Sequence, residues 1–169
     1  MIIQLLINNF AVVNSLDIEL DSGLTAITGE TGAGKSIMVD ALSLILGDRA
    51  DNSVIRDGAD RADICAVFDI SENNEARNWL KEHDLAPEEC IIRRSLANDG
   101  RSRAFINGRP VTLTQMRELG ESLLDIHSQH EHQSLMSKQT HRNLLDAYAG
   151  ATELAEEVAT AYQDWQALL

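Results

Sequence analysis

The eight residues GETGAGKS, from Gly29 to Ser36, constrain the fold of this chain more than any other stretch. They match the pattern GxxxxGK[ST] in full, with an apolar segment before them (24–28) and a longer one after them (37–46). Glycines let successive backbone N–H groups point into one concavity, and a following helix adds its positive N-terminal end. The motif therefore predicts a strand, a phosphate-binding loop and a helix that together hold a nucleoside triphosphate.

Each position of this loop has an expected role. Lys35 is expected to bring a mobile positive charge to the β and γ phosphates, as part of the catalytic machinery, and the Ser36 hydroxyl to ligate Mg²⁺. The phosphate cradle is predicted to consist of Gly29, Glu30, Thr31, Gly32, Ala33, Gly34, Lys35 and Ser36.

The sequence lacks the acid that hydrolysis requires at the end of a second strand. No run of four apolar residues is followed by Asp-Glu, and no LSGGQ-like segment occurs; the nearest acids are Asp69 and Asp125, each without a second acid. We therefore expect triphosphate binding without efficient turnover. One alternative is a self-contained small P-loop kinase or NTPase that uses Asp69 or Asp125 to hold Mg²⁺. Another is an interaction module whose phosphate loop only locks the fold.

Apolar periodicity and turn residues predict alternating strands and helices, an α/β or α+β fold. The predicted strands are 2–7, 12–20, 24–28, 64–70, 90–96, 102–107 and 122–127. The Asn98-Asp-Gly100 turn joins two of them in a hairpin. The predicted helices are the one that ends near Leu46 before Gly47, then 72–84, one that begins at Thr112 or Thr114 and ends near Leu119, 141–148 and 151–169.

The last predicted helix carries a different pattern. Its apolar residues recur at spacings of four and three, which is a heptad seam: Leu154, Val158, Ala161, Trp165 and Leu168. A coiled-coil arm and an ordinary amphipathic helix both fit so short a pattern. No cap follows Leu169, so we expect the pattern to continue in a longer protein.

Charge is unevenly distributed. The net charge of −13 argues against a general nucleic-acid-binding surface. The segment 91–109 nevertheless holds one acid, Asp99, against the arginines Arg93, Arg94, Arg101, Arg103 and Arg109. This island fits a contact to phosphate, on DNA or on a nucleotide, and equally the solvated face of a hairpin.

The two cysteines and the chain start bear on the compartment. Cys65 and Cys90 lie in separate apolar stretches without a CxxC pair, so we expect buried thiols. No apolar run reaches the roughly 18 residues of a membrane span, and the start lacks a basic signal region. A cytoplasmic protein is the expectation.

A polar cluster, IHSQHEHQ, occupies residues 126–133. His127, His130 and His132 offer three metal-ligating side chains, although their spacing matches no common zinc site. Gln129 offers a neutral amide that reaches the γ-phosphate and ligates Mg²⁺ without adding negative charge. A solvated loop is the third interpretation.

Five stretches resemble the RecN family of SMC-like, ABC-type ATPases in order along the chain. They are NNFAVV, SGLTAITGETGAGKS, ALSLILGDRA, DGRSRAFINGRPV and LLDIHSQHEHQSL, within residues 1–150. The resemblance implies the N-terminal lobe of an ABC/SMC-type head with a mixed sheet (1–150) and the start of a coiled-coil arm (151–169). It implies ATP and Mg²⁺ as cofactors, Gln129 as the Q-loop residue and Arg56 as the R-loop arginine, a contact to DNA or nucleotide.

The same resemblance implies a function in DNA double-strand-break repair. In such proteins a C-terminal lobe brings the signature motif, Walker B and the catalytic glutamate, and two heads sandwich ATP. The implied partners are therefore that C-terminal lobe, a second head in a homodimer, and DNA, in a cytoplasmic, nucleoid-associated protein. The chain by itself is expected to bind ATP rather than to hydrolyse it efficiently.

Overall fold

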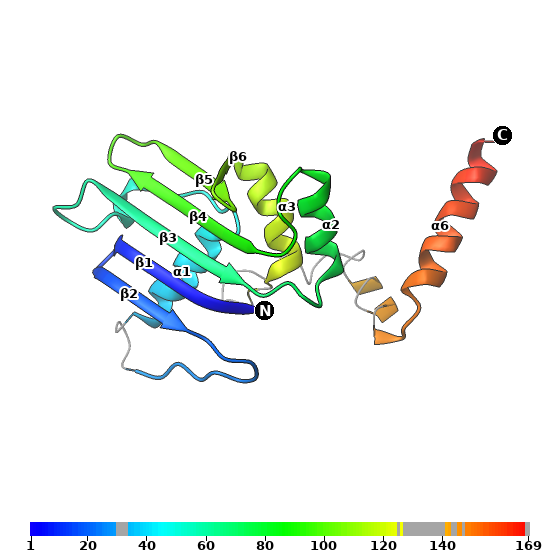
Figure 1. Ribbon diagram of the computed structural model, residues 1–169, viewed down its shortest axis with the longest axis horizontal. Coiled ribbons are helices and arrows are strands. Elements are labelled where there is room, and N and C mark those ends of the chain that lie inside the picture. The colour runs from blue at the N-terminus through cyan, green and yellow to red at the C-terminus, as the bar shows by residue number, and fades with distance from the viewer. Residues whose placement is uncertain (30–33, 125, 127–140, 143–144, 147, 168–169) are drawn as a thin grey trace. The chain divides into compact units, whose positions relative to one another are not determined.

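The computed structural model describes residues 1–29, 34–124, 126, 141–142, 145–146, 148–167. These fall into two compact units, residues 1–125 and 126–169, which are treated separately below (Figure 1). The predicted boundary at residue 150 stays a prediction.

The first unit is built on a six-stranded sheet with the strand order β2-β1-β3-β4-β5-β6. The strands are β1 (Ile2–Phe10), β2 (Val13–Glu19), β3 (Arg61–Phe68), β4 (Cys90–Ala97), β5 (Ser102–Ile106) and β6 (Arg109–Val111). Every pairing between these described strands is antiparallel. The predicted hairpin around Asn98-Asp-Gly100 is confirmed as β4 and β5.

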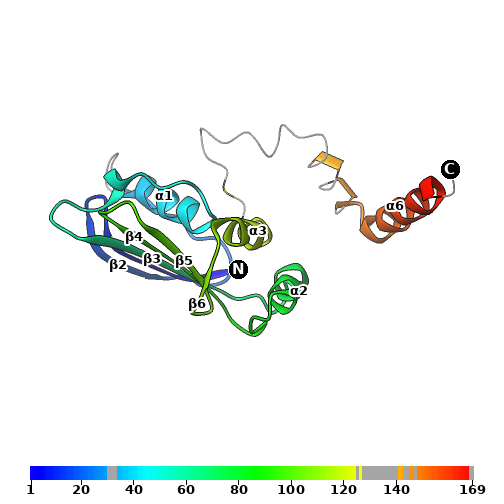
Figure 2. The ribbon, with the colours of Figure 1, turned by 90° about the horizontal axis from the view of Figure 1, so that it is seen from above.

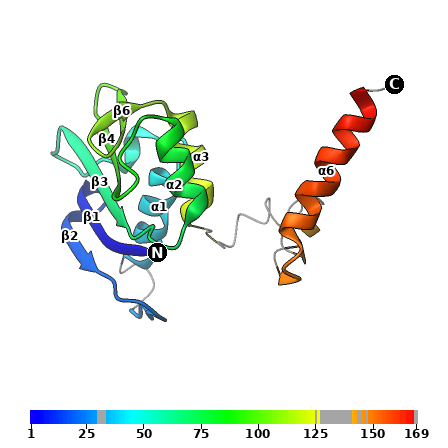
Figure 3. The ribbon, with the colours of Figure 1, turned by 45° about the vertical axis from the view of Figure 1, so that its right-hand side comes forward.

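Three α-helices and one short 3₁₀ turn accompany the sheet: α1 (Lys35–Ile45), η1 (Asn52–Val54), α2 (Asn74–Glu82) and α3 (Leu113–Leu123). Figures 2 and 3 show α1 lying along one face of the sheet. Its buried side chains recur at helical spacing, so one stripe faces the strands: Met38, Ala41, Leu44 and Ile45. Helix α3 begins with a capping box between Thr112 and Gln115.

Alternation along the strands separates a buried face from an open one. On β3 the residues Ala62, Ile64 and Ala66 are fully buried against the α1 side, while Arg61 and Asp63 between and beside them point the other way. No helix of residues 1–124 covers this second face, which we call the open sheet face (Figure 2). The open sheet face is therefore the surface on which polar side chains of the strands are displayed.

Three sequence predictions fail in this unit. Residues 24–28 form no strand, and Leu24 is fully exposed. The predicted strand 122–127 is wrong at its start, because Ser122 and Leu123 end α3. Strand β6 was missed, since its three residues include Pro110 and are too short for a period-two pattern.

The second unit contains α6 (Thr152–Ala167), which confirms the predicted terminal helix. Three residues of the predicted heptad seam are exposed on it, namely Leu154, Val158 and Trp165, and the seam itself stays a prediction. The described residues between 141 and 148 are helical, also as predicted. Within the described chain, no helix has the length and apolarity to cross a membrane.

The cysteines are both free thiols, with Cys90 buried and Cys65 partly exposed. Burial raises the pKa of Cys90 to about 12. The pKa of Cys65 is also raised, mainly by burial. The positive charge of Arg93 lowers this pKa in part, and the negative charge of Asp63 raises it. Since the thiolate is the reactive species, we expect an aromatic disulfide reagent at pH 8 to modify Cys65 first and Cys90 only on unfolding. Equal rates for the two thiols in the folded protein would contradict this burial pattern.

Candidate functional site

The N-terminal end of α1 presents backbone N–H groups that have no partner within the helix. Gly34 is the N-cap, with φ 97° and ψ −5°, and as a glycine it supplies no side-chain capping hydrogen bond. A φ in this range favours glycine strongly over residues that carry a Cβ atom. The first turn of α1 therefore offers free N–H groups and the positive end of the helix dipole, the arrangement that binds phosphate.

Both ends of the glycine loop meet at this helix start. The Lys35 ammonium is exposed and donates a hydrogen bond to the carbonyl oxygen of Gly29. Ser36 follows in the first turn and is exposed. Four residues of the predicted cradle lie outside the described part of the chain: Glu30, Thr31, Gly32 and Ala33. The described residues thus bring together Gly29, Gly34, Lys35 and Ser36.

Several other predicted groups are not placed beside this loop. Gln129, Asp125 and the histidines 127, 130 and 132 lie outside the described residues. Within the part that is described, no cluster of three metal-ligating side chains occurs. The Asp69 carboxylate accepts a hydrogen bond from the backbone N–H of Ser71, which lowers the pKa of Asp69. Nothing favours the kinase alternative.

A second cluster consists of arginines on the open sheet face. Arg61 and Arg93 share the Asp63 carboxylate, at 3.0 Å and 2.8 Å. The Arg93 guanidinium also lies 5.6 Å from the ring centroid of Phe105 on β5. Two strands thus contribute arginines to one patch in which the positive charges outnumber the carboxylate between them.

The patch continues to the β4–β5 turn. Arg101 pairs with Asp99 at 2.5 Å, and Arg103 stands on β5 opposite Ser95. The hydrogen bond from the Arg101 backbone N–H is the main cause that lowers the pKa of Asp99. Because Asp99 and Arg101 are exposed, this ion pair is screened by water and salt and is open to competition from other anions.

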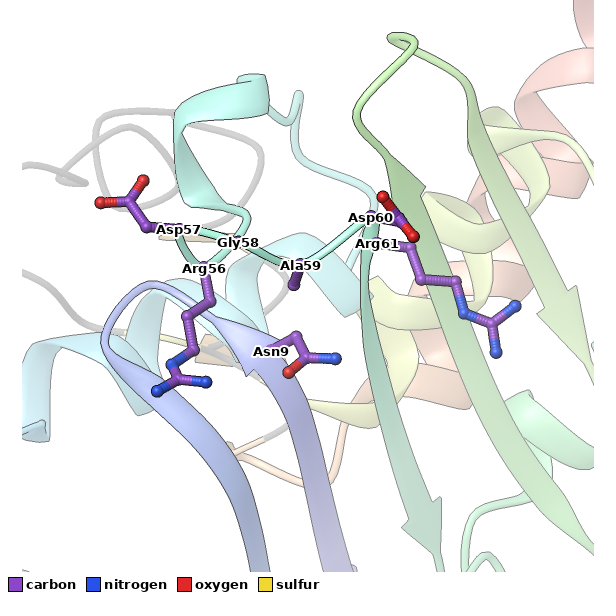
Figure 4. A pocket seen from close by; sticks show the side chains of 7 residues that line it. All are labelled: Asn9, Arg56, Asp57, Gly58, Ala59, Asp60 and Arg61. Carbon is purple, nitrogen blue, oxygen red and sulfur yellow. The ribbon is translucent and has the colours of Figure 1, made fainter.

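Three surface hollows join these arginines, and Arg61 lines all of them. The first hollow, of about 610 Å³, lies between Arg56 and Arg61 around Asn9 (Figure 4). The second, of about 440 Å³, adds Arg93, and the third, of about 230 Å³, adds Arg101 and Arg103. The arginine strip, defined as Arg56, Arg61, Arg93, Arg101 and Arg103, is therefore nearly continuous.

The loop that carries Arg56 is held to the sheet by backbone bonds. The Arg56 N–H donates to the Asn9 carbonyl at 2.9 Å, and the Asn98 N–H donates to the Asp60 carbonyl at 3.0 Å. The Arg56 guanidinium donates to the Asn14 side chain at 3.2 Å. These bonds fix the loop between the β1–β2 hairpin and the β4–β5 turn, so Arg56 has a defined place at one end of the strip.

Arg94 does not belong to this surface, and its prediction as a DNA or nucleotide contact is corrected. Strand alternation turns Arg94 inward, where it is 1% exposed, while its neighbour Arg93 faces outward. Sequence reasoning also missed Arg61. The signal was available, because Arg61 precedes Asp63 by two residues at the start of an alternating strand.

Comparison with known proteins identifies the family. The model of the AAA domain family matches residues 4–166. DNA repair protein RecN of Vibrio cholerae is 49% identical over 167 residues, which are 98% of this chain and 30% of that protein. DNA repair protein RecN of Bacillus subtilis is 39% identical over 168 residues, 98% of this chain and 28% of that protein. These matches confirm the resemblance drawn from the sequence.

Several solved structures that resemble this chain are SMC head domains. The Smc head domain of Pyrococcus yayanosii, with a coiled coil and joint, has a TM-score of 0.71 at 23% identity, covering 98% of this chain and 35% of that chain. An SMC ATPase studied for ATP-driven dimerisation and DNA-stimulated activation has a TM-score of 0.64 at 24% identity, covering 86% and 97%. The predicted fold class, a lobe of an SMC-type ATPase head, is confirmed.

Proposed function

Because this chain belongs to the AAA domain family and is similar to DNA repair protein RecN over nearly its whole length, we propose that it binds Mg²⁺-ATP as the N-terminal lobe of an SMC-like head acting in DNA repair and recombination. One observation carries the proposal. Helix α1 begins at the end of GETGAGKS, so that Lys35 and Ser36 lie in its first turn.

In this proposal the loop backbone holds the phosphates and Lys35 neutralises their charge. The Ser36 hydroxyl and the Gln129 amide oxygen are the Mg²⁺ ligands supplied by the chain. Mg²⁺ held by these oxygens would supply positive charge that offsets the negative charge of the phosphates. The direct test is an equilibrium titration of the chain with Mg²⁺-ATP, and the absence of saturable binding would overturn the proposal.

The chain spans about 30% of the length of the RecN proteins it matches, so a second lobe is part of the proposal. The segment 24–28 supports it. Leu24 is 100% exposed and Ile27 is 51% exposed, although both lie in a stretch with strand-like composition beside the phosphate loop. Apolar side chains in an unpaired extended segment favour a further strand that pairs with it. We assign that role to the C-terminal lobe of the same protein.

The arginine strip is the proposed contact to DNA, and a second head is the proposed partner in ATP-driven dimerisation. The chain is acidic overall, yet five of its arginines lie along adjoining hollows. Positive charge is therefore concentrated on this surface. Guanidinium groups bind phosphate oxygens bidentately, and a row of them follows a nucleic-acid backbone without reading its bases. A competing phosphate replaces Asp99 at its exposed ion pair with Arg101 at small cost.

Replacing Arg61 and Arg103 together by glutamine is expected to weaken binding of a 30-base-pair duplex about tenfold at low salt. The slope of log K against log salt should fall by about 2, since each phosphate contact contributes about 0.9 to it. Fluorescence anisotropy at several salt concentrations measures both quantities. Arg77→Gln is the matched control, because Arg77 lies on α2 and donates to the Ser71 carbonyl. An unchanged slope in the double variant would remove the strip from the DNA contact.

A further inference from the structure

Two arginines outside the phosphate loop and the arginine strip meet at the other end of α1. Arg94, from β4, donates hydrogen bonds from Nη1 to the carbonyl oxygens of Leu44, at 2.6 Å, and of Asp48. Arg117, from α3, donates from Nη2 to the carbonyl oxygen of Gly47 at 2.9 Å. Two guanidiniums from two different elements thus satisfy carbonyl groups at and just beyond the C-terminal end of the phosphate-loop helix.

The Arg94 guanidinium is buried, and the groups that accept its hydrogen bonds are neutral. Its side chain is 1% exposed, and Nε donates to the Ser102 hydroxyl at 3.1 Å. Burial lowers the pKa of Arg94, the Asp48 carboxylate raises it, and the positive charge of Arg117 lowers it again. The carbonyl groups at a helix C-terminus carry partial negative charge, which offsets the burial of a cation there. An apolar residue at this inward position would avoid this desolvation.

Helix α3 also approaches the end of α1 closely. Gly47 has φ 96°, and a Cβ atom added to it would lie 2.9 Å from the Arg117 Cβ. A Cβ atom added to Gly120 would lie 3.0 Å from a methyl carbon of Leu46. The two glycines allow the backbones to meet, and Arg117 adds a hydrogen bond across that contact. The carboxyl end of α1 is therefore fixed from the sheet and from α3 at once.

We propose that Arg94 and Arg117 are positioning residues for nucleotide binding, which fix the carboxyl end of α1 and thereby hold its phosphate-binding end in place. The 11 residues of α1 form a rod about 16 Å long. A tilt of about 4° around its carboxyl end moves Gly34 and Lys35 by about 1 Å, a displacement that weakens precisely oriented contacts severely. This inference rests on the proposed binding of Mg²⁺-ATP at that helix start.

The test compares Arg94→Met and Arg117→Met, which keep side-chain length and remove the donors. Each is expected to raise the Kd for Mg²⁺-ATP about tenfold at 10 °C, with the protein folded by circular dichroism. Arg94→Lys and Arg117→Lys, which keep the charge and one donor, should recover part of the affinity. Arg109→Met is the matched control, because the Arg109 guanidinium donates to the Asp84 carbonyl, at 2.9 Å, and not to the end of α1. The Kd of this variant for Mg²⁺-ATP should stay within twofold of that of the unaltered chain.

Amide hydrogen exchange provides a second measurement that does not depend on nucleotide. Exchange of residues 42–48 should be faster in both methionine variants than in the unaltered chain and in Arg109→Met. If Arg94→Met does not fold, Arg117→Met decides, because its side chain is only partly buried. Unchanged exchange would show that the arginines do not fix the helix end.

The outcomes separate this inference from the proposed function. A folded methionine variant with a lower Tm and an unchanged Kd would give the arginines a purely structural role and overturn the positioning role. An unaltered chain that binds no Mg²⁺-ATP would overturn the proposed function instead. If the unaltered chain binds and Lys35→Ala binds equally well, the assignment of the loop fails, whatever the Arg94 and Arg117 variants do.

Discussion

Replacing Lys35 by alanine is expected to weaken Mg²⁺-ATP binding by about a hundredfold or more and to leave the fold intact. Lys35 is half-buried, and its ammonium group donates a solvent-exposed hydrogen bond to the Gly29 carbonyl, so we expect the fold to tolerate its loss. Two charge-assisted hydrogen bonds to phosphate oxygens are together worth about 3 kcal/mol, and about 1.4 kcal/mol corresponds to a factor of ten in affinity.

Isothermal titration calorimetry at a fixed Mg²⁺ concentration measures this loss, and circular dichroism verifies the fold. Lys81→Ala is the matched control, because Lys81 is an exposed lysine in the last turn of α2. Its affinity should equal that of the unaltered chain. An unchanged affinity in Lys35→Ala would refute the assignment of GETGAGKS as the phosphate loop.

Local patterns allowed much of the first unit to be predicted. Buried and less buried residues alternate strictly along strand β3, and α1 begins within a complete phosphate-loop motif. The Asp99-Gly100 pair marks the β4–β5 turn. Each of these signals lies within about ten residues of sequence. The corresponding elements depend little on distant partners, so the sequence was enough to place them.

Features that depend on distant partners were predicted poorly. Residues 24–28 have the composition of a strand, but a strand also needs a neighbour, and none of the described strands pairs with them. Ser122 and Leu123 were predicted to begin a strand, but they form the last turn of α3, and Leu124 is the C-cap. Composition gives the preference of a segment, while pairing and caps decide its state.

The arginines illustrate the same limit at the level of the site. Sequence spacing grouped Arg93 with Arg94, yet strand alternation sends them to opposite faces of β4. The signal was present, because Arg94 stands between Ile92 and Leu96 on the apolar register. The partners of Arg94 lie about 50 residues earlier, at the end of α1, and no sequence pattern links the two. Its assignment required the fold.

ATP hydrolysis by this chain alone is expected to equal the Lys35→Ala blank, and to rise by at least about a hundredfold when the remaining part of a RecN-type protein is added. Each positioned group that orients water or stabilises developing charge increases the rate by a factor of about 10²–10³. The sequence has the loop that binds phosphate but no apolar strand that ends in Asp-Glu. Under the proposed function, a second segment supplies the acid for efficient turnover.

The exposed segment 24–28 provides a structural readout for the same experiment. If a strand of the added segment pairs with it, backbone amides of residues 24–28 should exchange more slowly in the mixture than in the chain alone. Ile27→Asp should reduce both the slower exchange and the turnover, since a charge at a pairing apolar surface opposes burial. Val39→Asp on α1 is a control for charge alone, because Val39 is also an exposed apolar residue.

Clear Lys35-dependent turnover by the chain alone would overturn this division of the active site. The missing acid would then have to lie within these residues, and Asp69→Asn would be the first variant to measure. The Asp69 carboxylate already accepts the Ser71 N–H, and its lowered pKa keeps it ionised near neutral pH, as a Mg²⁺ ligand must be. Loss of that turnover in Asp69→Asn would make the chain a complete small P-loop enzyme, whereas turnover confined to the mixture would establish that the two segments share one active site.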